Sequence, residues 1–197
     1  MHALVNRALR CFLRDSHGAT LWAQVAQTAG VPESGGAGLG RVDPARTEGL
    51  VAAAAAALHR DREGLLEDLG TYLVSHPNMA PMRRLLRYGG ICFVDFLHAL
   101  PDLPDRARLA VPDLALPSFD LRAEGQGRYV LRLGRGWPGV GPIVVGALRA
   151  LADDYGTLAM LVRTPGADGD DSIAIDVVDT AFASGRAFEL AVPAVAG

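Results

Sequence analysis

The chain has 197 residues, of which 50% are hydrophobic and 21% charged, a composition typical of one globular domain or at most two small ones. Lys and Arg number 19 against 22 Asp and Glu, a net charge of −3 with no basic excess, which disfavours nucleic-acid binding. The longest apolar run, 51–58, is too short to span a bilayer, and the N-terminus has no apolar signal-peptide core. We therefore expect a cytoplasmic protein that binds neither nucleic acid nor membrane.

Residues 1–100 have the apolar spacing of helices. Apolar side chains recur every three to four residues over 3–14 and 19–29, which predicts two amphipathic helices with a break at 15–18. Asp43 and Asp61 are typical N-caps, and they predict two more helices, the second ending near Val74. Further helices are expected at 82–88 and at about 90–100.

After residue 113 the apolar period shortens to that of strands. Strands are expected at about 114–121 and 129–133, joined by a polar hairpin turn at Arg122–Gly127. A helical pattern follows over 139–155, and two more strands are expected at 158–162 and 173–178. The segment 182–190 is a candidate extension of the sheet.

The order of these elements predicts an α+β fold. A helical N-terminal subdomain, about 1–100, is expected to precede an antiparallel sheet with helices, about 113–190. Together they form one predicted domain over 1–190, and 191–197 is a C-terminal tail. The interval 101–117, rich in proline and aspartate, is the expected seam.

No set of residues indicates catalysis. Gly134, Gly136 and Gly139 have the spacing of a dinucleotide-binding loop, but Pro138 has no N–H for a phosphate and only 58 residues follow Gly139. None of the five histidines lies in a zinc motif, and no nucleophile stands beside a general base in a known pattern. The residues favour a binding module over an enzyme.

Four segments keep the order and spacing of a known family over about residues 1–163: MHALVNRALRCFLRDSHGATLW, LVAAAAAALHRDREGLLEDLGTYLV, LLRYGGICFVDFLHALPDLPDRARLAVPDLALPSF and PGVGPIVVGALRALADDYG. They resemble haem-nitric oxide/oxygen-binding (H-NOX) domains, which include stand-alone bacterial proteins and the sensor domain of soluble guanylate cyclase. The resemblance implies haem b as cofactor, nitric oxide sensing in signal transduction, and a histidine kinase or cyclic-dinucleotide enzyme as partner.

The family's iron-ligating histidine lies in a helix that reads F-L-x-x-L-x-x-L-H, about a dozen residues before a P-x-F segment. Here 96–104 reads FLHALPDLP, and the P-x-F segment 117–119 follows 13 residues after Pro104. The histidine position therefore falls on Pro104, which has no lone pair for iron. We expect no metal ligand there. Replacement of Pro104 by histidine is expected to raise haem affinity and to restore a helix that an interior proline weakens by about 3 kcal/mol.

The family's Y-x-S-x-R motif, which holds the haem propionates, is also altered. Its positions fall on Leu133, Arg135 and Trp137. Arg135, or its neighbour Arg132, remains a candidate partner for one propionate, since a guanidinium binds a carboxylate through two hydrogen bonds. The alternative is that Arg135 is a solvated charge at the end of a strand.

Apolar positions that face the haem plane in the family match this chain. Pro117 matches a proline that presses on the porphyrin, and Ile143 matches the position of a distal tyrosine in oxygen-binding members. Isoleucine cannot donate a hydrogen bond to oxygen, so the distal side resembles members selective for nitric oxide. The resemblance assigns these residues to cofactor binding: Val5, Leu9, Leu73, Leu116, Pro117, Arg135 and Ile143.

Two histidines are weak candidates for a replacement iron ligand. His98 precedes Pro104 by six residues, about 240° around a helix, and so faces away unless Pro101 and Pro104 break the helix. His76 matches a family position on the helix that flanks the distal side. The alternatives are a partly buried helix residue for His98 and a cap before Pro77 for His76.

Two functions follow from the resemblance. The first is an H-NOX sensory module in which ordinary haem ligation is in question. The second is a degenerate, haem-free interaction or scaffold protein, or a binder of another planar hydrophobic ligand.

Overall fold

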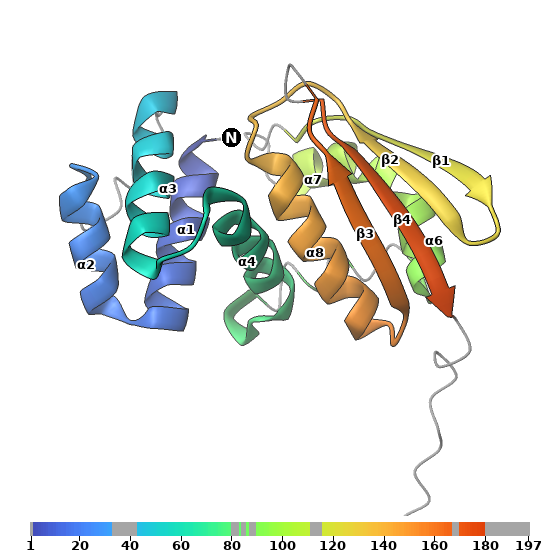
Figure 1. The fold of residues 1–197 in the computed structure, drawn as a ribbon, viewed down its shortest axis with the longest axis horizontal. Coiled ribbons are helices and arrows are strands. Elements are labelled where there is room, and N and C mark those ends of the chain that lie inside the picture. Colours follow the sequence, from blue (N-terminus) through green and yellow to red (C-terminus); the bar gives the residue numbers. More distant parts are fainter. Residues whose placement is uncertain are drawn as a thin grey trace, which may run out of the picture.

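The computed structural model of the chain describes residues 2–32, 43–79, 83, 86, 90–110, 116–166 and 170–179. It has the predicted α+β fold, with helices preceding an antiparallel sheet (Figure 1). The N-terminal elements are α1 (His2–His17), α2 (Ala19–Thr28), α3 (Pro44–Leu58), α4 (Arg62–Ser75) and the short 3-10 helix η1 (Pro77–Met79). Then come α6 (Phe93–Ala99), the 3-10 helix η2 (Leu100–Asp102), α7 (Leu103–Ala110), β1 (Phe119–Gly125), β2 (Arg128–Leu133), α8 (Val140–Asp154), β3 (Leu158–Thr164) and β4 (Ser172–Asp179).

The sheet has the strand order β1-β2-β4-β3, and every neighbouring pair is antiparallel. Side chains alternate across it, so that Leu131 and Leu133 of β2 are buried while Arg132 between them is exposed. One face of the sheet therefore contributes to a core, and the other carries charged and small side chains together with exposed apolar ones such as Met160 and Val162.

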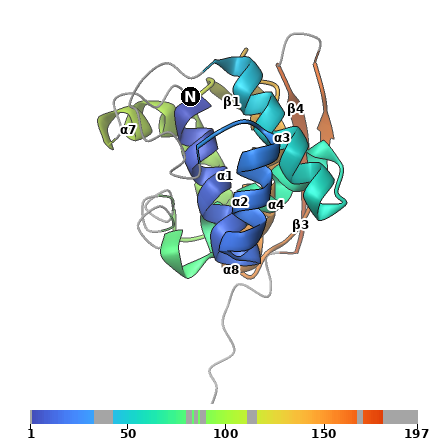
Figure 2. The same ribbon diagram turned by 90° about the vertical axis from the view of Figure 1, so that its left-hand side faces the viewer.

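Two apolar cores form, one in each half of the molecule. The helical core is built from α1 to α4, and the sheet core from α6, η2, the sheet and α8. In Figures 1 and 2, α1, α2 and α3 form a layer at one end of the molecule, and the sheet lies at the other end. Packing thus groups α6 with the sheet, whereas chain order alone assigned residues up to about 100 to the helical subdomain.

Helices α4 and α8 lie side by side between the two cores (Figure 1). Glycines stand where their backbones meet. A Cβ at Gly70 would collide with the carbonyl oxygen of Ile143, and a Cβ at Gly146 would collide with that of Glu67. The Thr71 hydroxyl donates to the Gly146 carbonyl at 3.3 Å. Only glycine permits this approach of two helix backbones.

Ion pairs add to the contact between the halves. Glu67 of α4 pairs with Arg149 of α8. Glu63, in the first turn of α4, pairs with Arg163 of β3, which also bonds the buried Asp171 at 2.9 Å. Arg163 is 9% exposed, and its two carboxylate partners balance the charge that this position removes from water.

Three expected boundaries differ from the structure. Helix α1 runs through 15–17 and stops at Gly18, whose φ of 92° breaks the helix. The hairpin turn is confined to 126–127, because residues 122–125 continue β1 and Gly125 pairs with Arg128. The seam contains η2 and α7, since proline is tolerated in a helix's first turn. The expected helix at 82–88, apart from residues 83 and 86, and the extension at 182–190 lie outside the described residues.

We expect Gly70→Ala to destabilise the protein by about 2 kcal/mol or more, because the new methyl group forces α4 and α8 apart. Alanine at an open helix position normally stabilises, so Gly49→Ala is the matched control. At Gly49 of α3 nothing lies within 4 Å of the place that a methyl group would take, and its replacement should add about 0.5–1 kcal/mol. Urea unfolding of both variants measures the difference, and equal effects would contradict the close contact.

Candidate functional site

Three of the predicted cofactor-binding residues meet in the helical core. Leu9 of α1 is fully buried there, and Leu73 of α4 and Ile143 of α8 pack against it as partly buried side chains. Because Gly70 lies one turn before Leu73 and touches the Ile143 carbonyl, the close contact of α4 and α8 brings these two side chains to one place. Val5 of α1 is also buried, at 9% exposure, but belongs to neither core.

The segment before β1 lies beside the loop between β2 and α8. Pro117 is buried and Leu116 is half-buried. A Cβ at Gly136 would lie 3.6 Å from the Pro117 Cβ, and Gly134 donates its N–H to the Ser118 carbonyl at 2.8 Å. The P-x-F segment and the altered Y-x-S-x-R segment are therefore neighbours in space.

The altered Y-x-S-x-R positions point to different surroundings. Leu133 is buried in the sheet core, Arg135 is exposed, and Trp137 packs against the helical core. The Trp137 indole N–H donates to the Glu48 carboxylate of α3 at 2.6 Å. Arg135 also interacts with other groups of the chain. One cation, Arg135, thus remains at the altered Y-x-S-x-R positions, and the residue at the third position, Trp137, is bonded to the helical half.

Pro104 is buried at the second position of α7. There it needs no backbone N–H, because the first turn of a helix has no acceptor for it. The expected gain of about 3 kcal/mol from its removal is therefore wrong, since that penalty applies to a helix interior. The α-helix that carries His98 does not run on to Pro104, because α6 ends at Ala99 and the 3-10 helix η2 precedes α7.

The sequence was compared with family models, with curated proteins and with solved structures. The Haem-NO-binding (HNOB) family model matches residues 2–161. The chain belongs to this family. None of the curated proteins matches it.

Solved H-NOX structures share the fold. An Fe(II) unliganded H-NOX protein from K. algicida has a TM-score of 0.71 at 14% identity, over 92% of this chain and 99% of that one. A mutant of T. tengcongensis H-NOX has a TM-score of 0.72 at 10% identity, over 92% and 100%. An H-NOX protein from S. oneidensis in the Fe(II)NO state has a TM-score of 0.70 at 14% identity, over 91% and 100%.

The resemblance assigns the HNOB iron ligand to the position of Pro104, and a histidine-ligated haem does not fit that residue. The donor set decides this, because a buried proline offers iron no lone pair. Among the residues that the structure describes, no three His, Cys, Asp or Glu side chains cluster in a way that would hold a metal ion. The same residues include no helix that is long and apolar enough to cross a bilayer.

His98 lies on the exposed side of α6, which differs from the partly buried position considered for it. Its ring meets the Tyr129 ring edge-on, with the centroids 5.7 Å apart. Tyr129 belongs to β2 and packs against the sheet core. The candidate iron ligand His98 therefore lies at the sheet, whereas Leu9, Leu73 and Ile143 belong to the helical core.

His76 caps the C-terminal end of α4 beside α1. Its ring packs at a tilt against Tyr72 with the centroids 4.8 Å apart, and its Nδ1 accepts the Asn78 backbone N–H at 3.3 Å. The same nitrogen lies 3.9 Å from the Asp15 carboxylate. His76 is thus part of a polar cluster that joins α1 to the end of α4.

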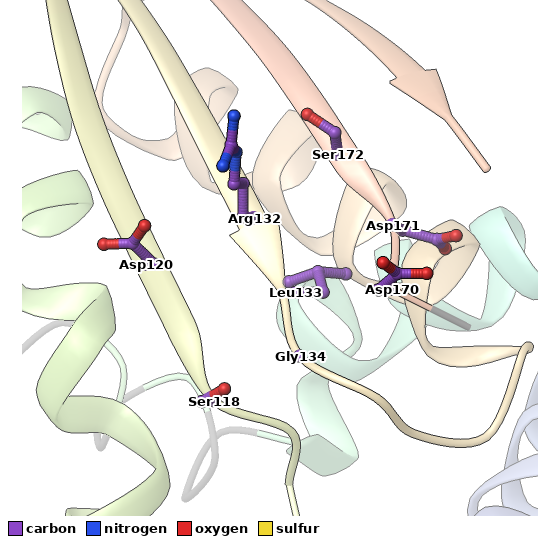
Figure 3. Close-up of a pocket in the computed structure, with 8 residues that line it drawn as sticks. All are labelled: Ser118, Asp120, Arg132, Leu133, Gly134, Asp170, Asp171 and Ser172. Carbon is purple, nitrogen blue, oxygen red and sulfur yellow. The ribbon is translucent and has the colours of Figure 1, made fainter. Parts of the chain in front are cut away.

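A pocket of about 430 Å³ lies where the start of β1, the end of β2 and the start of β4 come together (Figure 3). Figure 3 shows Asp120, Arg132 and Ser172 on three neighbouring strands, at the polar face of the sheet. Ser118 and Gly134 lie at the end of the sheet, beside Pro117 and Arg135 in the chain. The pocket therefore adjoins the P-x-F segment and the altered Y-x-S-x-R segment, and of the residues considered for cofactor binding it is lined by Arg132.

Sequence reasoning missed two features of this region. Trp137 was identified as a motif position, but its bond to Glu48, 89 residues away, leaves no signal in spacing. Asn6, next to Val5, has a buried Oδ1 with no hydrogen-bond partner among the residues that the structure describes. A buried unpaired oxygen requires a donor from water or a ligand, so Asn6 is a further candidate for ligand contact.

The polar cluster at α1 and α4 predicts an acid-sensitive contribution to stability. The Tyr72 hydroxyl donates to Asp15 at 2.5 Å and lowers the pKa of that carboxyl below its ordinary 3.8, and the Asn78 amide, at 2.9 Å, adds to the effect. Burial, with the Asp15 charge, raises the pKa of Tyr72. Because the folded pKa of Asp15 is lowered, its contribution is complete above pH 3.8 and is lost as pH falls through the folded pKa.

We expect Tyr72→Phe to raise the pKa of Asp15 and to reduce the loss of stability on acidification, because phenylalanine keeps the ring but not the donor. A carbon-13 titration of the Asp15 carboxyl and urea unfolding between about pH 7 and pH 2 measure both effects. Asn78→Ala should act in the same direction with a smaller shift. An unchanged Asp15 titration in Tyr72→Phe would contradict the assignment.

Proposed function

We propose that this chain is a sensory module of the H-NOX type that binds a planar, porphyrin-like ligand without an iron–histidine bond. The observation that carries the proposal is the buried Pro104 in the first turn of α7, at the position of the family's iron ligand. The fold around this residue is that of the family. The proposal therefore changes the chemistry at the ligand position but not its place in the structure.

Apolar burial is the proposed source of affinity. Leu9, Leu73 and Ile143 meet in one core, and Pro117 lies beside the loop that carries Arg135. Burying a few hundred Å² of a porphyrin face at about 25 cal/mol/Å² gives several kcal/mol, from which the cost of association subtracts. Arg135 is the proposed partner of one propionate.

The remaining assignments rest on the resemblance. Ile143 offers no hydrogen bond to oxygen, which supports nitric oxide as the gas if haem b is the ligand. The proposed partner is a cytoplasmic signalling enzyme, a histidine kinase or a cyclic-dinucleotide enzyme. The module itself is proposed to be non-catalytic and to bind neither nucleic acid nor membrane.

A haem-free interaction or scaffold protein is the second candidate. It is supported by Trp137, which packs against the same core as Leu73 and Ile143 and bonds Glu48. In this alternative the chain's own side chains stabilise the region that a cofactor stabilises elsewhere in the family.

We expect the protein as isolated to lack stoichiometric, histidine-ligated haem. On reconstitution it should bind zinc protoporphyrin and haemin with similar affinities, micromolar or weaker, because iron coordination adds little. Absorbance titration in the Soret region measures both. A five-coordinate ferrous–imidazole spectrum in the isolated protein would contradict the proposal, and no binding of either porphyrin would favour the scaffold.

Three substitutions separate the contributions to this binding. Arg135→Ala should weaken both porphyrins alike, by removing a propionate contact. His76→Ala and His98→Ala should leave both affinities unchanged. Selective loss of haemin binding in either histidine variant would identify that residue as the iron ligand.

We expect Pro104→His to raise haemin affinity by about tenfold or more over zinc protoporphyrin, because only iron gains a strong imidazole ligand. The stability gain of a mended helix is not expected, since Pro104 lies in a first turn. Pro101→His is the matched control: Pro101 is exposed in η2 and should not change haemin binding. No gain in Pro104→His would mean that the surrounding residues no longer fit haem.

A further inference from the structure

The loop between β2 and α8 is fastened to the helical half by one side chain. The Trp137 indole N–H donates to Glu48 Oε1 of α3 at 2.6 Å. The Arg62 guanidinium of α4 donates to the same carboxylate at 3.1 and 3.2 Å. Three segments distant in the sequence thus meet at one carboxylate.

The Arg62 guanidinium also lies over the indole. Its central carbon is 5.7 Å from the Trp137 ring centroid, within the range of a cation–π contact. Glu48 holds Arg62 in this place and accepts the indole N–H at the same time. Each member therefore fixes the other two, and removal of Glu48 releases both.

The shape of the loop fits the indole. A Cβ at Gly139 would collide with the six-membered ring of Trp137, so the ring folds back over the loop's own backbone. Its other surface packs against the helical core, with Leu73 and Ile143 at the edge of that core. The loop also carries Arg135, and its Gly136 lies beside Pro117.

We propose that Trp137, Glu48 and Arg62 form a latch that holds the loop 134–139 closed against the helical half, with Trp137 as its positioning residue. The latch itself does not depend on the proposed function. Only its effect on ligand entry rests on that function. Because Gly136 lies beside Pro117 and Trp137 packs against the same core as Leu73 and Ile143, the loop contacts both parts of the proposed ligand site, and the proposal extends to the latch setting the rate of ligand entry.

The test follows the indole itself, in the full-length chain. The sequence has two tryptophans, Trp22 and Trp137, so labelling with 5-fluorotryptophan gives two fluorine-19 resonances, which Trp137→Phe assigns. In Glu48→Ala the Trp137 resonance should shift toward that of water-exposed tryptophan, and amide exchange of 134–139 should rise about tenfold or more, the factor for a lost charge-assisted hydrogen bond. Trp22, 4% exposed in the helical core, serves as an internal reference.

Two further variants separate the latch from general loosening. Glu48→Gln keeps an acceptor oxygen and should restore the Trp137 resonance to its original position. Glu67→Ala removes a different ion pair between the halves, with Arg149, and should leave Trp137 unchanged. An unmoved Trp137 resonance in Glu48→Ala, or an equal shift in Glu67→Ala, would overturn the latch.

Ligand entry is measured by stopped-flow binding of zinc protoporphyrin. Glu48→Ala should bind it about tenfold faster than the unmodified chain, in step with loop opening. An unchanged rate, together with a shifted Trp137 resonance, would overturn the gating role. If no variant binds the porphyrin, the proposed function is wrong, and the fluorine and exchange results still decide whether the loop is latched.

Discussion

The contact between α4 and α8 sets the position of everything else in the molecule, because it holds the two cores at a distance that only glycine allows. Gly70 meets the Ile143 carbonyl, and Gly146 meets that of Glu67. Backbone contacts of this kind leave no side chain to rearrange, so the two helices have little freedom to slide. Leu73, one turn beyond Gly70, and Ile143 consequently share a site whatever binds beside them.

A second set of contacts surrounds this fixed pair of helices and is made by longer side chains. Glu67 with Arg149, Glu63 with Arg163, and Glu48 with Trp137 each join the helical half to the sheet half. These groups have rotatable side chains and can separate one at a time, unlike the backbone contact. The structure thus combines a rigid joint between two helices with releasable bonds around it, an arrangement in which a loop can open while the cores stay in place.

Much of this fold was predictable from the sequence. The α+β order, the four strands and most helices follow from apolar periodicity and N-caps, because local spacing fixes which face of each element is buried. Residues 122–124 were misread as a turn because polar side chains on a strand's solvent face look like a loop. No helix was predicted in the seam 101–117, although Pro101 and Pro104 each stand at a helix start, where proline signals a beginning rather than an end.

The candidate site was predictable only in part. Leu9, Leu73 and Ile143, which the resemblance grouped by position, lie together in the helical core, whereas the absence of an iron ligand at Pro104 stays a prediction. The bond from Trp137 to Glu48 was not predictable, because it depends on how α3 packs beside the β2–α8 loop, and neither residue type has a spacing that indicates the other. The close contact of α4 and α8 at Gly70 and Gly146 could not be predicted either, since a glycine within a helix does not reveal what lies against it.

Pro104 and Trp137 are best understood together. The resemblance places both residues at positions that the family uses to hold a cofactor, and in this structure each of them supports the fold itself. Pro104 begins α7, and Trp137 ties a loop to α3 through Glu48. Both cores are closed by side chains of the chain, with residues such as Leu9, Leu69 and Leu131 fully buried. On the proposal made above, a ligand that binds beside Leu73 and Ile143 acts on the releasable contacts around the loop rather than on the joint between α4 and α8.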